Sequence, residues 1–85
     1  MDTTALEQAI AIAGGQSALA RLVSKRSSPV KQSHVWHWLN RDLKVPPEHC
    51  YAIELATGVT CEELRPDLQW LRDGDVVVGY CIHFS

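Results

Sequence analysis

The chain has 85 residues, 46% of them hydrophobic, and a formal net charge of −2 at pH 7. This length allows one domain with a modest core and excludes an enzyme built from two lobes around a cleft. There is no apolar run of roughly 18 residues and no export signal, so we expect a cytoplasmic protein without a membrane segment. Cys50, Cys61 and Cys81 are odd in number and far apart, as expected for reduced thiols.

The first part of the chain predicts two short helices. Thr4 and Glu7 form a capping box, and apolar residues then recur at helical spacing as far as Gly14-Gly15, which predicts a left-handed helix end. A second apolar repeat starts at Gln16-Ser17 and ends near Ser24. Because only the glycine pair joins them, the two helices must pack at a sharp angle.

A third helix follows an exposed turn, because residues 24–29 contain no large apolar side chain. Ser28 is a good N-cap and Pro29 suits a first helical position, so this helix could begin as early as Pro29. Over residues 30–40, a winding of about 100° per residue places two sets of side chains on opposite sides. The side predicted to face the core carries Val35, Trp38 and Leu39. The opposite side carries Ser33, Trp36, His37 and Asn40.

Two more helices are expected after the Val45-Pro46-Pro47 stretch. The fourth ends at Thr57-Gly58, and a capping box from Thr60 to Glu63 opens a short fifth helix that Pro66 closes. The residues predicted on the buried side of the fourth helix are Cys50, Ile53, Leu55 and Ala56. We therefore predict an all-α fold, a compact five-helix domain over residues 1–70, followed by a strand-like tail over residues 71–85.

The tail differs from the helices in composition. Asp73-Gly74-Asp75 predicts a turn, and residues 76–84 are β-branched and aromatic, which favours a strand. A lone strand has unpaired backbone on both edges, so its partner is either a second copy of the chain or an unpredicted strand within it. We expect a homodimer through this tail, with folding back as the alternative. The predicted dimerisation residues are Val76, Val78, Tyr80, Ile82 and Phe84.

Charge is unevenly distributed along the chain. Six lysines and arginines but one acid lie between Arg21 and Lys44, whereas the remainder has two arginines and nine acids. Phosphate binding depends on the local field, so this basic segment indicates a polyanion partner, with a solvated basic loop as the alternative. The segment includes the third helix, whose outward side carries hydrogen-bonding groups and one large aromatic. Duplex DNA is the best candidate for what that side contacts.

A series of short motifs occurs in a specific order between residues 14 and 67. They are Gly14–Ala20, Val30–Gln32, His34–Trp36, Trp38-Leu39, Val45-Pro46, Ala56–Val59 and Leu64–Asp67. Together they resemble the helix-turn-helix of Cro and repressor proteins, and more closely the YdaS-like Cro/antitoxin family, over about residues 4–70. The resemblance implies a five-helix, DNA-binding bacterial regulator, often prophage-encoded, such as a Cro-like repressor. The turn before the third helix is several residues longer than in typical Cro-type domains.

The resemblance also implies which residues contact DNA, with the third helix in the major groove. The base-reading candidates are Gln32, Ser33, Trp36 and His37, although Trp36 could instead be hydrophobic cover or a dimer contact. The phosphate-binding candidates are Gln16, Ser17, Lys25, Arg26, Lys31, Asn40, Arg41 and Lys44. We expect a homodimer on a palindromic operator in the bacterial nucleoid, with no cofactor, no metal and no catalytic residue.

Two alternatives from other functional classes remain. His34 and His37 share one helix and Cys81 and His83 share one strand face, which suggests a metal site, but no CxxC or HExxH spacing supports it. The second alternative is an antitoxin or interaction module that binds a toxin or a phage regulatory protein through its acidic helices. Its surface would carry Glu48, Glu54, Glu62 and Glu63.

Overall fold

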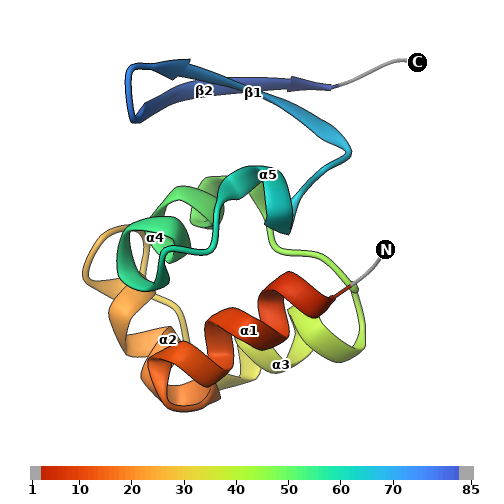
Figure 1. The fold of residues 1–85 in the computed structure, drawn as a ribbon. Coiled ribbons are helices and arrows are strands. Elements are labelled where there is room, and N and C mark those ends of the chain that lie inside the picture. Colours follow the sequence, from red (N-terminus) through yellow and green to blue (C-terminus); the bar gives the residue numbers. More distant parts are fainter. Residues whose placement is uncertain (1–2, 83–85) are drawn as a thin grey trace.

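The computed structural model describes residues 3–82 as a helical body with a β-hairpin at one end (Figure 1). The helices are α1 (Thr4–Ala13), α2 (Gln16–Ser24), α3 (Gln32–Asn40), α4 (Pro47–Thr57) and α5 (Cys61–Leu64), and the strands are β1 (Leu68–Asp73) and β2 (Val76–Ile82). The hairpin lies beyond α5, at the end of the molecule opposite α1 and α3. All five predicted helices are present, and α2 covers the predicted segment.

Glycines and one capping box set several helix ends. Gly14, at φ 100°, ends α1 in the left-handed region, and its N–H donates to Ile10 O at 3.0 Å. The predicted box at Thr60 is confirmed, because its hydroxyl accepts from Glu63 N at 3.2 Å while Glu63 Oε2 accepts from Thr60 N at 3.0 Å. The predicted box at Thr4 is wrong, because α1 already includes Thr4 and its N-cap is Thr3.

One hydrophobic core joins the five helices and the connection before α4. Its largest fully buried side chains are Leu19, Val23, Val35, Val45, Cys50, Ile53 and Cys61. Cys50 and Ile53 confirm the predicted buried side of α4, but Leu55 is 49% exposed and was wrongly placed there. Leu55 follows Ile53 by two positions, which corresponds to about 200° around a helix, so it lies on the opposite side.

The prediction of an all-α fold is wrong, because β1 and β2 form an antiparallel two-stranded sheet. The sequence of β1 contains no β-branched residue, so local propensity does not favour a strand there. Pairing with β2 imposes the strand, and burial along β1 alternates accordingly. The partner strand is therefore within the chain, which is the alternative the sequence left open. β1 also crosses residue 70, where the sequence suggested the tail would begin.

A β-bulge changes which face each residue of β2 occupies. Leu71 pairs with Gly79 but Arg72 pairs with Val77, so Val78 is an extra residue on β2. Tyr80 consequently lies opposite Trp70, with ring centroids 5.4 Å apart, on the face that packs against the core. Val76 and Val78 occupy the outward face. The predicted dimerisation residues therefore do not share one face, and Phe84 lies outside the described residues.

Arg65 links the hairpin to the helical body. Its guanidinium is buried, donates to Val45 O at 2.9 Å, and makes two hydrogen bonds to the carboxylate of Asp67 at 2.8 and 2.9 Å. Its carbonyl oxygen accepts from Trp70 Nε1 at 3.1 Å. One side chain and its own backbone thus join the segment before α4, the end of α5 and the start of the sheet.

Candidate nucleic-acid interface

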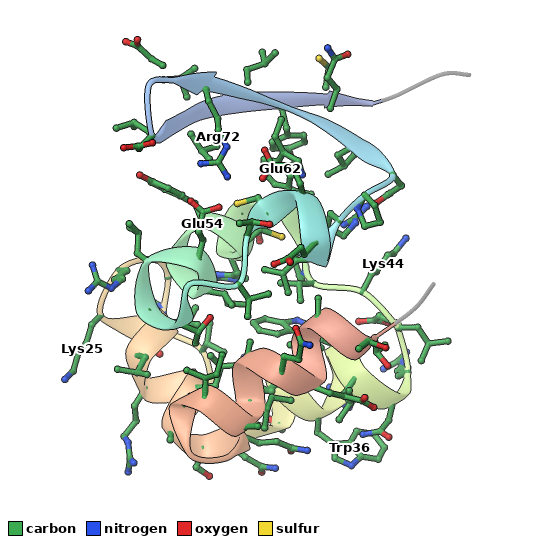
Figure 2. The ribbon with its side chains drawn as sticks, in the orientation of Figure 1. Lys25, Trp36, Lys44, Glu54, Glu62 and Arg72 are labelled. Carbon is green, nitrogen blue, oxygen red and sulfur yellow. The ribbon has the colours of Figure 1, made fainter. Side chains whose placement is uncertain are left out.

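The two predicted sides of α3 are confirmed. Val35 and Trp38 are 0% and 5% exposed and belong to the core, with Leu39 half-buried beside them. The opposite side exposes Gln32, Ser33, Trp36 and Asn40 and leaves His37 half-buried. Trp36 lies at the end of the molecule opposite the hairpin (Figure 2). The helix therefore presents a polar and aromatic ridge on a rigid support.

α3 begins at Gln32 and not at Pro29, the earliest start that the sequence allowed. Val30 is 8% exposed, and its N–H donates to Ser24 Oγ at 2.7 Å, so tertiary contacts hold this segment outside the helix. The N-cap is Lys31, in extended conformation, and its N–H donates to His34 Nδ1 at 3.0 Å. The exposed side chain of His34 thus satisfies the first free amide of α3, a role that the sequence did not suggest.

The first residues of α2 and α3 touch each other. Gln32 Nε2 donates to Gln16 Oε1 at 2.6 Å. The structure therefore brings one predicted base-reading residue into contact with one predicted phosphate ligand, across 16 positions of sequence. Ser17 is exposed beside them at the start of α2. This contact fixes both amides at the N-terminal end of the ridge.

Trp36 and Asn40 lie farther along the ridge. Trp36 is 48% exposed, and the ring of His37 meets it edge-on with centroids 5.5 Å apart. Half of the indole surface remains open, which leaves room for a partner. The side chain of Asn40 turns back, and its Nδ2 donates to Trp36 O at 3.1 Å. Asn40 therefore keeps its carbonyl oxygen free but uses a donor within its own helix.

Five predicted phosphate ligands flank α3 at its two ends. Lys25, Arg26 and Lys31 precede the helix, and Arg41 and Lys44 follow it. All five are exposed, and none forms a salt bridge or a side-chain hydrogen bond within residues 3–82. Lys25 and Lys44 project from opposite sides of the body in Figure 2. Positive charge thus brackets the ridge rather than forming a single patch.

The acidic surface of the alternative function is largely engaged within the protein. Arg72 Nη1 donates to Glu54 Oε2 at 3.0 Å and its Nε donates to Glu62 Oε2 at 2.9 Å, between the hairpin and the helices (Figure 2). These hydrogen bonds lower the pKa of Glu54 and the pKa of Glu62. Glu63 caps α5. Within the described residues, Glu48 makes only a 3.9 Å contact from Oε1 to His49 Nε2. Three of these four carboxylates therefore already make hydrogen bonds within the fold.

The metal alternative gains no support from the described residues. No group of three or more His, Cys, Asp or Glu side chains within residues 3–82 could hold a metal ion, and His83 lies outside this range. Burial raises the pKa of Cys50 and of Cys61 to about 12, so both thiols keep their protons and are poor ligands. His34 already uses Nδ1 at the start of α3.

Sequence reasoning missed two residues beside this surface. His49 is 8% exposed on α4, where its Nδ1 lies 2.9 Å from Ser27 Oγ and its ring lies 5.3 Å from that of Trp38. Ser27 belongs to the turn that carries Lys25 and Arg26. The two partners are 22 positions apart, and no local pattern in the sequence indicates such a contact.

The comparisons with known proteins agree with the family that the motifs suggest. Residues 6–73 match the family described as Bacterial toxin YdaS. The chain is 47% identical over 66 residues to a protein of Escherichia coli (strain K12) named "Putative transcriptional regulator YdaS". That alignment covers 75% of this chain and 62% of the relative, so the chain spans less than two thirds of its relative's length.

Two further observations accompany these matches. No solved structure matches the chain. Among the described residues, no helix is both long enough and apolar enough to cross a membrane. The family match begins within α1, includes the other four helices and ends with β1, so it joins the helical body to the first half of the hairpin. The chain therefore belongs to the YdaS family.

Proposed function

We propose that this chain is a non-enzymatic transcriptional regulator that binds double-stranded DNA with α3 in the major groove. The observation that carries the proposal is the exposed ridge of α3 between two groups of unpaired cations. A helix fits the major groove, where side chains near its N-terminus approach base edges. The name of the Escherichia coli relative, a transcriptional regulator, supports the same conclusion.

The contact between Gln16 and Gln32 leaves each side chain with groups for a different part of DNA, a base for Gln32 and a phosphate for Gln16. Gln32 gives one N–H to Gln16, which leaves its second N–H and its carbonyl oxygen for N7 and N6 of an adenine. Gln16 accepts through Oε1, so both of its N–H groups remain to donate to a phosphate beside the N-terminus of α2. Ser33 and His37 would read neighbouring bases, and Trp36 would pack on sugars or thymine methyl groups.

The salt dependence of binding tests this proposal. Log affinity should fall with log salt by about 0.9 for each phosphate contacted, because each contact releases a counterion. Replacing Lys25 and Arg26 together with alanine should flatten that slope, whereas exchanging them as Lys25→Arg and Arg26→Lys keeps the charges and should preserve it. A wild-type slope near zero would contradict DNA binding. The DNA should be a sequence selected from a random pool, compared with unselected DNA.

The homodimer belongs to the same proposal, since two copies on a palindromic operator would double the contacts. Support comes from the outward face of the hairpin, where Leu71, Val76 and Val78 are 44%, 51% and 64% exposed. Val76→Lys combined with Val78→Lys should convert the dimer to a monomer in sedimentation measurements and weaken operator binding. An unchanged mass in the double variant would show that the outward face of the hairpin does not form the dimer interface.

We also propose that the regulator represses transcription, that it is encoded by a prophage, and that it acts in the cytoplasm or nucleoid. A reporter gene downstream of the selected site should be silenced by the wild type and released by Gln32→Ala. The family description as a bacterial toxin favours a second candidate function, growth inhibition, with or without a toxin or phage protein as partner. Growth inhibition that Gln32→Ala abolishes would depend on DNA binding, whereas inhibition that survives this change would require another target.

A further inference from the structure

The turn between α2 and α3 is long, yet side chains hold it at its base and in its middle. Ser24 Oγ accepts from Val30 N at 2.7 Å and lies 2.9 Å from Val30 O and 2.8 Å from Ala20 O. This serine closes the turn at its base, where α2 ends and the approach to α3 begins. A turn closed only at its base would leave Lys25 and Arg26 free to move.

A second contact holds the middle of the turn. Ser27 Oγ lies 3.2 Å from Val23 O, to which it donates, and 2.9 Å from His49 Nδ1. Because the Ser27 hydroxyl donates its hydrogen to Val23 O, Ser27 Oγ accepts from Nδ1–H of His49. Ser28, the next residue, makes no hydrogen bond within the described part of the chain. The turn therefore docks on α4 through one serine and not its neighbour.

His49 also contacts the recognition helix. Its ring is tilted by 31° against the ring of Trp38, with the centroids 5.3 Å apart. Trp38 is the largest buried side chain of α3. One imidazole thus touches both parts of the proposed DNA surface, the basic turn and the helix that reads bases.

The surroundings of His49 favour its neutral form. Burial lowers its pKa, and the charge of Glu48, whose Oε1 lies 3.9 Å from Nε2, only partly opposes this. His34 on α3 lowers the pKa further. A neutral ring can remain stacked on Trp38 and bonded to Ser27 without the cost of burying a charge.

We propose that Ser27 and His49 are positioning residues, which hold Lys25 and Arg26 in a fixed place relative to α3 so that phosphate and base contacts form together. This role rests on the proposed DNA binding. Contacts made by preorganised side chains lose less conformational entropy on binding than contacts made by a mobile turn. The affected contacts are with phosphates, so their loss should be nearly independent of DNA sequence.

Ser27→Ala is the first test, with Ser27→Thr as the variant that keeps the hydroxyl and Ser28→Ala as the matched control. Ser27→Ala should weaken binding about threefold to tenfold on selected and random DNA alike and lower the magnitude of the salt slope by about 0.9 to 1.8, equivalent to one or two phosphates. Ser27→Thr should restore most of the slope, and Ser28→Ala should match the wild type. Circular dichroism and melting temperature must show that each variant is folded at the temperature of the binding measurement.

A pair of His49 variants gives a second, independent test. Both His49→Asn and His49→Gln remove the ring on Trp38, but the asparagine amide reaches about as far as Nδ1 and the glutamine amide about as far as Nε2. His49→Asn should therefore keep more of the wild-type salt slope than His49→Gln, even where both have the same melting temperature. If His49 served only to stabilise the fold, His49→Asn and His49→Gln would have equal salt slopes.

The outcomes separate the two proposals. If the wild type binds DNA but Ser27→Ala keeps its salt slope, the positioning role is overturned and DNA binding stands. A loss of melting temperature without a change of slope has the same meaning, as does an equal loss in Ser28→Ala. If the wild type shows no salt-dependent binding, the proposed function fails first and the positioning role fails with it.

Discussion

The two charged regions of this small protein use their side chains in opposite ways. On the hairpin side, Arg72 forms hydrogen bonds with Glu54 and Glu62, and Arg65 pairs with Asp67. Around α3, five lysines and arginines are exposed and form no salt bridge within residues 3–82. Arg72 joins β1 to α4 and α5, whose paired carboxylates are 18 and 10 positions away, whereas the Arg65 pair spans two positions in the connection from α5 to β1. The cations around α3 join no elements by salt bridges within residues 3–82, which is the state expected of charges that bind a partner.

The difference shows that net charge is a poor guide for this protein. Its value of −2 counts Glu54, Glu62 and Asp67, which pair with arginines in the fold, together with the five cations around α3, which form no salt bridge within residues 3–82. An incoming polyanion can reach the five exposed cations around α3, whereas Arg65 and Arg72 are already bonded to carboxylates on the hairpin side. Acid and Arg72→Ala remove the pairing on the hairpin side, whereas Gln32→Ala and Lys25→Gln change only the side around α3.

Acidification should affect the hairpin side most. Hydrogen bonds from Arg72 lower the pKa of Glu54 and of Glu62, and Arg65 lowers the pKa of Asp67. The stability these carboxylates contribute is complete above their unfolded pKa of about 4, and it is lost as pH falls through their lowered values in the folded state. Melting temperatures should therefore drop steeply below about pH 4. His49, with its lowered pKa, adds an earlier and smaller loss that begins near pH 6.5.

Arg72→Ala should give the next largest effect. It leaves two carboxylates facing each other and removes the link from β1 to α4 and α5. The melting temperature should fall, hydrogen exchange in β2 should accelerate, and the melting curve should depend less on pH below about pH 4. Arg72→Lys, which keeps the charge but loses the planar fork, should be intermediate. Salt dependence of DNA binding should not change, and a flatter slope in Arg72→Ala would mean that the two charged regions are coupled.

Gln32→Ala tests the basic side through its base contact. We expect a loss of about 1–3 kcal/mol in binding to the selected DNA sequence and much less on random DNA, because only the correct adenine uses both amide groups. His37→Ala should behave similarly. Gln16→Ala should instead weaken both DNAs alike. If Gln32→Ala lost equal affinity for both DNAs, Gln32 would contact the phosphate backbone and not a base.

Much of the helical body could be predicted because its signals are local. The repeats of α1 and α2, the glycine ends and the box at Thr60 each depend on residues within one or two turns. The two sides of α3 followed from the same periodicity. The start of α3 did not, since the burial of Val30 and its hydrogen bond to Ser24 depend on packing that Ser28-Pro29 does not reveal.

The missed features all depend on contacts between distant residues. β1 forms a strand because β2 pairs with it, and the bulge at Val78 moves Tyr80 to the other face. Glu54 looked like a free surface acid because its partner, Arg72, is 18 positions away. The predicted base-reading residues lie together because they all belong to the outward side of α3.

Lys25→Gln should give the smallest change in stability of all these variants. It therefore tests whether a charge near α3 can be removed without a cost to the fold, unlike the charge of Arg72. Lys25 is exposed and forms no salt bridge within the described residues, so its removal should change the free energy of unfolding by less than about 0.5 kcal/mol. DNA affinity should nevertheless fall, and the salt slope should lose about 0.9 if Lys25 contacts one phosphate. Chemical denaturation and a salt titration on the same sample would measure both. A marked loss of stability in Lys25→Gln would show that the basic charges also serve the fold.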